Sequence, residues 1–232
     1  MMKLSLSTAA ALAFGVAFSA AADSVFKLET GASMLLFEQK EAAGAPRMFL
    51  RHIGSKTADT ASALNLAWNK ESKDSMGTVA PLAYSVFGDS AGALNRFGGL
   101  SVTFPDGCRS LDLEVAEATV KTGSCGNKTL AVRYKDRHYP LEVRQLVSAA
   151  PQGIDVFTTS VTVFNKGDKP VRLGRMDSLS VVLPLVADRF YLQSAAAQWA
   201  SEGQLNTSEI VRGQTVSIGS RSGAHWAAAD WR

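Results

Sequence analysis

The residues of this chain that could carry chemistry are carboxylates, histidines and tryptophans scattered over many segments. A pair of carboxylates held close together can hydrolyse a glycosidic bond, one as acid/base and the other as nucleophile. Asp89, which follows Phe87-Gly88, and Glu202, three residues after Trp199, are the carboxylates least easily explained as turn residues. The other candidates lie in turn contexts, where aspartate accepts hydrogen bonds from backbone N–H groups: Asp74, Asp106, Asp155, Asp168 and Asp188. The carboxylates alone therefore predict no active site.

Nucleophilic and metal-dependent chemistry are not indicated either. A triad needs a histidine base beside its nucleophile, but His52, His138 and His225 lie in unrelated segments and no Gly-x-Ser-x-Gly motif occurs. No zinc-ligand spacing is present, and the glycine-rich stretch 92–99 fits neither a dinucleotide-binding nor a P-loop spacing. We therefore expect no catalytic residue, no metal and no cofactor in this chain.

The four tryptophans offer a binding chemistry, because sugar rings stack on exposed aromatic side chains. They are Trp68, Trp199, Trp226 and Trp231. Tryptophan in a β-rich protein is more often buried in a core or an interface. Both interpretations remain open for each of them.

Composition points to a folded chain with an unremarkable surface. Hydrophobic residues make up 46% of the 232 residues and charged residues 19%, which argues against disorder. The net charge is +3, and no block of five or six basic residues occurs. We therefore expect no nucleic-acid partner.

The N-terminus has the features of an export signal. Lys3 precedes an apolar stretch, Leu4 to Phe18, and Ala20-Ala21-Ala22 provides the small residues that a signal peptidase requires. We expect cleavage before Asp23, so that 1–22 is a signal peptide and the mature protein is periplasmic or extracellular. The alternative is an uncleaved membrane anchor, since the apolar stretch approaches the length of a spanning helix. No later segment is apolar enough to span a membrane, so no membrane contact is expected after cleavage.

Export gives the two cysteines a specific interpretation. Cys108 and Cys125 are an even pair in an oxidising compartment and are separated by turn residues and one strand-like segment. We expect a disulfide, which would stabilise the fold by roughly 3 kcal/mol through loop closure. The alternatives are free buried thiols or metal ligands, but two cysteines without His or carboxylates at ligand spacing fall short of the four ligands of a metal site.

Beyond residue 24 the hydrophobic pattern has a period of two, which is typical of half-buried antiparallel strands. The inward-facing sets are Leu111, Leu113 and Val115; Leu130, Val132 and Tyr134; Leu141 and Val143; and Phe157, Thr159, Val161 and Val163. Turn residues separate these segments at 105–107, 151–153 and 165–170. Strands at roughly ten-residue spacing predict a sandwich or barrel.

The segment from Thr57 to Asn95 is less regular, as functional or interface loops often are. A short helix is expected from Thr60 to Trp68. No linker marks a second domain, so the prediction is an all-β chain with one antiparallel β-sandwich over residues 23–232.

Several motifs in order along the chain resemble the N-terminal domain of glycoside hydrolase family 36, the α-galactosidase family. The resemblance is carried first by Phe26–Thr30, Leu50–Gly54 and Pro81–Asp89, where Ser85 replaces the family's usual proline. It continues through Phe104-Pro105-Asp106-Gly107 with Ser110–Leu113, Tyr134–Asp136 with Tyr139–Val143, Asn165-Lys166-Gly167 with Pro170–Leu173, Phe190–Leu192, and Trp199–Glu202. The match covers roughly residues 25–226. It weakens at Ser220–His225, which is one residue short of the family's pattern.

This resemblance implies a large antiparallel supersandwich, like that of galactose mutarotase, which precedes a catalytic (β/α)-barrel. In the family the barrel holds both catalytic aspartates and hydrolyses terminal α-galactosides. Neither the family's Lys-Trp-Asp nucleophile segment nor its acid/base segment occurs here. We therefore expect a chain that is inactive alone, and Trp199 and the region of Asp74 are its candidate substrate-binding positions.

Two functional hypotheses follow. The first is the non-catalytic front domain of an α-galactosidase-like hydrolase, in a truncated or fragmentary chain whose barrel is missing or encoded separately. The second is a stand-alone secreted sandwich that binds a galactoside, an oligosaccharide or a protein. Self-association into a homo-oligomer is expected in either case, because an isolated front domain exposes apolar surface.

Overall fold

The structure is a computed structural model, and it divides into two compact units, Met1–Val182 and Leu183–Arg232. Each unit is described by itself. The residues that the structure describes are 24–42, 44–64, 71–73, 79–81, 99–151, 153–179, 189–198, 201–211, 214, 216, 218–219 and 230–231. The expected signal peptide lies outside them.

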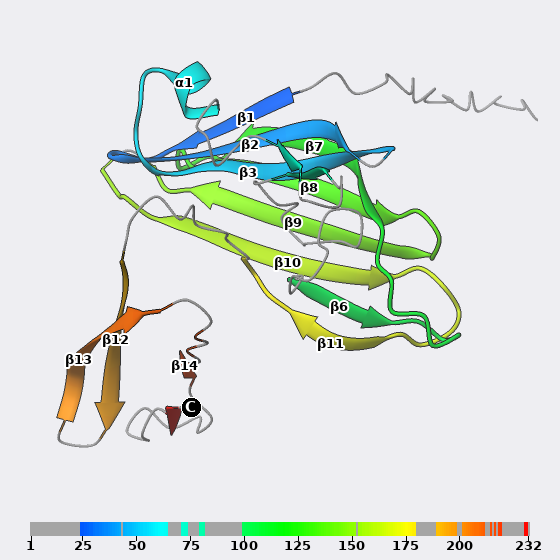
Figure 1. Ribbon diagram of the computed structural model, residues 1–232. Coiled ribbons are helices and arrows are strands. Elements are labelled where there is room, and N and C mark those ends of the chain that lie inside the picture. Colours follow the sequence, from blue (N-terminus) through cyan, green and yellow to red (C-terminus); the bar gives the residue numbers. More distant parts are fainter. Residues whose placement is uncertain are drawn as a thin grey trace, which may run out of the picture. The chain divides into compact units, whose positions relative to one another are not determined.

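The first unit is built around two antiparallel sheets (Figure 1). One sheet has the order β1-β2-β3, and its strands are Ser24–Glu29, Ser33–Ala42 and Ala45–Ser55. The other has the order β10-β9-β8-β7, with β7 at Leu113–Thr122, β8 at Lys128–Asp136, β9 at Leu141–Ala149 and β10 at Phe157–Asn165. Consecutive strands pair throughout both sheets, so each is a meander of hairpins.

Shorter elements complete this unit. Strand β6, Leu100–Thr103, pairs with β11, Arg172–Met176, and β4, Glu71–Lys73, pairs with β5, Val79–Pro81. Helix α1 covers Thr60–Leu64, and the Asp59 carboxylate accepts a hydrogen bond of 2.9 Å from the Ser62 N–H, as an N-cap does. The predicted helix is therefore confirmed at its start, while its expected second half lies outside the described residues.

One hydrophobic core joins the two large sheets. Leu28, Phe37 and Met48 from the first sheet are at most 1% exposed and belong to the same buried cluster as Leu130 and Val143 from the second. The fold class is thus an all-β antiparallel sandwich, as the sequence predicts. Burial of one such leucine stabilises the fold by about 2 kcal/mol relative to exposure.

The predicted alternation is confirmed in β8 and β9 of the second sheet. In β8, Leu130, Val132 and Tyr134 are at most 2% exposed, whereas the residues between them are half-buried. Strand β7 departs from strict alternation, because its pairing register shifts between Val115 and Glu117. Such a bulge inserts an extra residue and turns later side chains to the other face.

The second unit contains two hairpin-like pairs. Strand β12, Phe190–Gln198, pairs with β13, Ser201–Ile210, and β14, Ile218–Gly219, pairs with β15, Asp230–Trp231. Large apolar side chains on this unit are exposed, among them Tyr191 at 57% and Leu205 at 69%. No helix in the described part of the chain is long and apolar enough to cross a membrane.

Candidate functional site

The substrate-binding positions expected from sequence cannot be placed. Trp199 and Asp74 both lie outside the described residues, as does Asp89. Glu202 belongs to β13, but its side chain lies outside the described part.

The expected disulfide is not formed: Cys108 and Cys125 are both free cysteines in the structure. Cys108 precedes β7 and Cys125 follows it, so a strand of ten residues separates them. At about 3.3 Å per residue that strand is about 30 Å long, whereas the two Cα atoms of a disulfide must lie within about 7 Å. Instead, the Cys125 thiol donates a hydrogen bond of 2.9 Å to the side chain of Asn127. The prediction was wrong because the strand between the cysteines carries them to opposite ends of β7.

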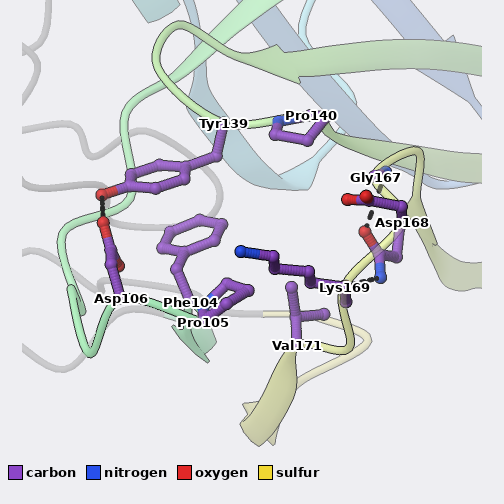
Figure 2. Close-up of a pocket in the computed structure, with 10 residues that line it drawn as sticks. Phe104, Pro105, Asp106, Tyr139, Pro140, Gly167, Asp168, Lys169 and Val171 are labelled. Carbon is purple, nitrogen blue, oxygen red and sulfur yellow. Dashed lines mark hydrogen bonds between the residues drawn. The ribbon is translucent and has the colours of Figure 1, made fainter.

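A pocket of about 400 Å³ lies where three turns of the first unit converge (Figure 2). The turns follow β6, β8 and β10. The residues that line the pocket are Phe104, Pro105, Asp106, Tyr139, Pro140, Asn165, Gly167, Asp168, Lys169 and Val171. Most of the wall is apolar, and the charged groups are two aspartates and one lysine.

The first turn, after β6, is closed by its own hydrogen bonds. The Phe104 N–H donates to the Cys108 carbonyl at 2.9 Å, and the Gly107 N–H donates to the Phe104 carbonyl at 2.9 Å. Gly107 has φ of 85°, a left-handed conformation that glycine adopts without steric cost. The Asp106 carboxylate accepts a further bond of 2.9 Å from the Cys108 N–H. The Pro-Asp-Gly turn predicted from sequence is therefore confirmed.

The second turn, between β8 and β9, is held by the buried carboxylate of Asp136. One of its oxygens accepts hydrogen bonds of 2.9 Å from the N–H groups of His138 and Tyr139. The other accepts a bond of 2.8 Å from the Asp112 N–H. Asp136 is only 7% exposed, so these bonds offset the cost of burying its charge. As a result Tyr139 and Pro140 are presented to the pocket from a fixed turn.

Behind this turn, a buried cation ties the two sheets together. The Arg47 side chain is 2% exposed; it donates to the Leu113 carbonyl and lies 2.5 Å from the Asp112 carboxylate. Arg137 and His138 also approach Asp112, each at 3.3 Å. Burial acts to raise the pKa of Asp112, but the hydrogen bond and charge of Arg47 outweigh it and hold that pKa below its ordinary value.

The third turn, between β10 and β11, is organised by Asn165. Its side-chain oxygen accepts a hydrogen bond of 3.1 Å from the Gly167 N–H, and its side-chain nitrogen donates to the Lys169 carbonyl at 2.8 Å. The Lys166 N–H donates to the Pro140 carbonyl at 2.8 Å, which joins the third turn to the second. Asparagine is suited to this role because its amide can replace backbone partners in a turn.

An aromatic pair forms one wall of the pocket. The rings of Phe104 and Tyr139 are stacked, with centroids 3.7 Å apart and planes 10° from parallel. The Tyr139 hydroxyl donates a hydrogen bond of 2.7 Å to the Asp106 carboxylate (Figure 2). The first and second turns are therefore joined by both a ring contact and a hydrogen bond.

These contacts shift the protonation of three groups in the same place. Hydrogen bonding to Cys108 and then to Asp106 raises the pKa of Tyr139 above its ordinary range. Hydrogen bonding with Tyr139, followed by a bond from the Ser110 N–H, lowers the pKa of the Cys108 thiol. The Cys108 N–H and then the Tyr139 hydroxyl lower the pKa of Asp106. At neutral pH the wall thus carries a carboxylate and a neutral phenol.

The opposite side of the pocket carries Asp168 and Lys169, which are both exposed. Figure 2 shows the Lys169 side chain extending toward Phe104. Within the described ranges, no ion pair or hydrogen bond engages the side chain of either residue. The pocket therefore offers a free donor and a free acceptor beside an apolar wall. Across the described ranges, no group of three or more His, Cys, Asp or Glu side chains could hold a metal ion.

The sequence predicts the first and third turns, at 105–107 and 165–170, but not the pocket. Asp106, Tyr139 and Asn165 lie in separate segments, up to 59 positions apart in the chain. Their convergence depends on strand order, since β9 lies between β8 and β10. Three turn motifs at one end of an antiparallel meander are the signal that could have indicated a shared site.

A comparison with protein families identifies the family of this chain. Residues 47–229 match the glycosyl hydrolase family 36 N-terminal domain. No protein of curated function matches the chain.

Solved structures similar to this chain include α-galactosidases. The Lactobacillus brevis α-galactosidase is similar with a TM-score of 0.70 and 18% identity, over 85% of this chain and 28% of that one. The α-galactosidase AgaB of Geobacillus stearothermophilus has a TM-score of 0.67 and 18% identity, over 86% of this chain and 30% of AgaB. The galactosidase domain of the α-galactosidase-sucrose kinase AgaSK has a TM-score of 0.68 and 17% identity, over 85% of this chain and 29% of that domain.

This chain thus spans less than a third of the length of the enzymes it resembles. Its sandwich corresponds to a part of each of them. With a family match over most of its residues, the chain belongs to the N-terminal domain family of glycosyl hydrolase family 36.

Proposed function

We propose that this chain is the non-catalytic front domain of an α-galactosidase-like glycoside hydrolase, and that a catalytic barrel supplies the hydrolysis of terminal α-galactosides. The family match over residues 47–229 is the observation that carries the proposal. The α-galactosidase structures that share the fold support it, since the chain corresponds to less than a third of each. Retaining hydrolysis needs two carboxylates about 5–5.5 Å apart, and the family's two catalytic segments are missing from this sequence.

The role of such a domain is to support the barrel and to assemble with it. Apolar side chains exposed on the first unit are consistent with covered surfaces in an assembly: Ile154, Val156, Leu173, Met176 and Leu179 are all more than 40% exposed. A second copy of this chain could also cover these apolar side chains, and the assembly would then be a homo-oligomer. A galactoside or oligosaccharide is the small-molecule partner that this function implies.

Export is part of the same proposal. The apolar stretch that ends in Ala20-Ala21-Ala22 supports a leader over residues 1–22, with the mature protein in the periplasm or outside the cell. N-terminal sequencing of protein recovered from each cell fraction tests it. A mature chain that begins at Asp23 is expected, whereas an intact Met1 in the exported fraction would contradict cleavage.

The proposed function is tested by supplying the barrel. The chain is expressed alone and together with the polypeptide encoded directly downstream of it, and hydrolysis of a nitrophenyl α-galactoside is measured on both preparations. We expect activity only with the second polypeptide, and co-elution of the two. A downstream region that encodes no barrel in any frame, or a barrel that neither binds this chain nor gains activity from it, would contradict the proposal.

A further inference from the structure

The three-turn pocket is preformed, because each of its turns is fixed by hydrogen bonds that do not involve a ligand. Asp106, Asp136 and Asn165 each accept backbone N–H groups of their own turn. The Phe104–Tyr139 stack and the bond between Lys166 and Pro140 then lock the turns to one another. Small-molecule sites are usually concave, largely preformed and about 300–1,000 Å³ in volume. This pocket, at about 400 Å³, meets those conditions.

The chemistry of the wall selects the kind of ligand. Phe104, Pro105, Tyr139, Pro140 and Val171 provide a largely apolar surface, which suits a ligand with a carbon–hydrogen face. The charged groups at the rim are of both signs, and they can satisfy several hydroxyl groups. These features together favour a compact molecule that combines an apolar face with many hydroxyls.

The charged groups at the pocket are of both signs. A ligand with a net charge would be attracted by one of these groups and repelled by another, the groups being the carboxylates of Asp106 and Asp168 and the Lys169 ammonium. A neutral polyol instead accepts a hydrogen bond from Lys169 and donates to Asp168, whose side chains are not engaged elsewhere in the described part of the chain. From this combination we propose that the three-turn pocket is a binding site for a neutral sugar, either free or as the terminal residue of an oligosaccharide.

This site lies within the chain itself and does not rest on the proposed catalytic barrel. The experiment therefore uses the chain alone. Failure of sugar binding would leave the proposed function standing, and failure of the proposed function would leave the sugar site standing. The chain, labelled with nitrogen-15, is titrated with D-galactose, with raffinose, with galacturonate as the anionic probe and with galactosamine as the cationic probe. Amide shifts of Gly107 and Gly167 report on the first and third turns.

We expect saturable shifts of these two amides with galactose or raffinose, with weak affinity in the region of a 1 mM Kd. Stronger binding of raffinose than of galactose indicates a terminal residue as the natural ligand, and equal binding indicates a free sugar. Either result supports the site. Shifts that saturate only with galacturonate or only with galactosamine would overturn the assignment of a neutral ligand, and absence of saturable shifts at either amide would overturn the site.

Variants on the third turn test whether the sugar binds to the groups of the pocket or to a neighbouring surface. Lys169→Met and Asp168→Ala remove the two free rim groups, and both residues are exposed, so the fold is retained. Lys166→Met is the control, because the Lys166 ammonium lies 5.3 Å from the Phe164 ring centroid and 3.8 Å from Glu142 and does not line the pocket. We expect about a tenfold loss of affinity in each rim variant, equivalent to about 1.4 kcal/mol, and none in the control. Equal affinity in Lys169→Met and the wild type would overturn the proposal.

Discussion

Replacement of Asp112 with alanine is expected to destabilise the sandwich more than any exposed charge mutation on the same sheet. The substitution leaves the Arg47 guanidinium, which is 2% exposed, without its carboxylate partner at 2.5 Å. It also removes the acceptor of Arg137 and His138. The Leu113 carbonyl remains as a partner of Arg47.

The size of the effect follows from burial. Loss of one partner of a fully buried ion pair costs about 3–5 kcal/mol. The Asp112 side chain is 17% exposed, so water compensates in part, and we expect about 3 kcal/mol, the low end of that range. With a urea slope of about 2 kcal/mol per molar, the unfolding midpoint would fall by about 1.5 M.

The assay is equilibrium urea unfolding followed by far-ultraviolet circular dichroism. The matched control is Glu117→Ala on β7, since Glu117 and Arg133 form a 3.5 Å pair whose side chains are 59% and 39% exposed. An exposed pair of this kind contributes less than about 1 kcal/mol. The double variant Arg47→Met with Asp112→Leu should regain much of the lost stability, because it removes both charges of the Arg47–Asp112 pair together.

A loss in Asp112→Ala no greater than that in Glu117→Ala would refute the reasoning. It would mean that water reaches Arg47 and that the cation is not part of the contact between the sheets. Failure of the double variant to recover stability would instead show that packing around Asp112, rather than charge, carries the effect.

Three further predictions concern acid, a turn glycine and the thiols. Because the folded pKa of Asp112 lies below its ordinary 3.8, the stability that this carboxylate contributes is present above about pH 4 and is lost as the pH falls through the folded value. The free energy of unfolding of the wild type, measured in urea, should therefore fall more steeply in acid than that of Asp112→Ala. Parallel pH profiles of the two proteins would contradict this prediction. Gly107→Ala should cost about 1 kcal/mol through its φ of 85° alone, since nothing lies within 4 Å of the added methyl; Gly31→Ala, equally open but without a positive φ, is the control, and equal melting temperatures would contradict the turn geometry. Both thiols, Cys108 and Cys125, should react with a thiol reagent in the unfolded protein without reductant, and an intact mass two hydrogens lower would show the disulfide instead.

The alternation of apolar and polar residues predicted the strands, because every second side chain of a strand in this sandwich faces the core. Leu130, Val132 and Tyr134 alternate in sequence, and all of them face the core in β8. The sequence also indicated the turn at Asp106-Gly107, since glycine at φ of 85° and an aspartate that accepts a nearby N–H are local requirements.

Non-local arrangements could not be predicted in the same way. Asp112 appeared only as a polar residue between two apolar ones, and its partner Arg47 lies 65 positions earlier on another sheet. The disulfide prediction was wrong because the number of residues between two cysteines does not say how far apart they lie in the fold. Here β7 lies between them and places the thiols at opposite ends of that strand. The pocket likewise depends on strand order, which brings three distant turns to one place.

The most direct test of the central claim, a family 36 front domain without its own catalysis, is hydrolysis of a nitrophenyl α-galactoside by the purified chain. We predict no turnover above the uncatalysed rate, because the family's two catalytic segments are missing from this sequence. Turnover that persists through purification and is lost in Asp89→Asn or Glu202→Gln would contradict that claim.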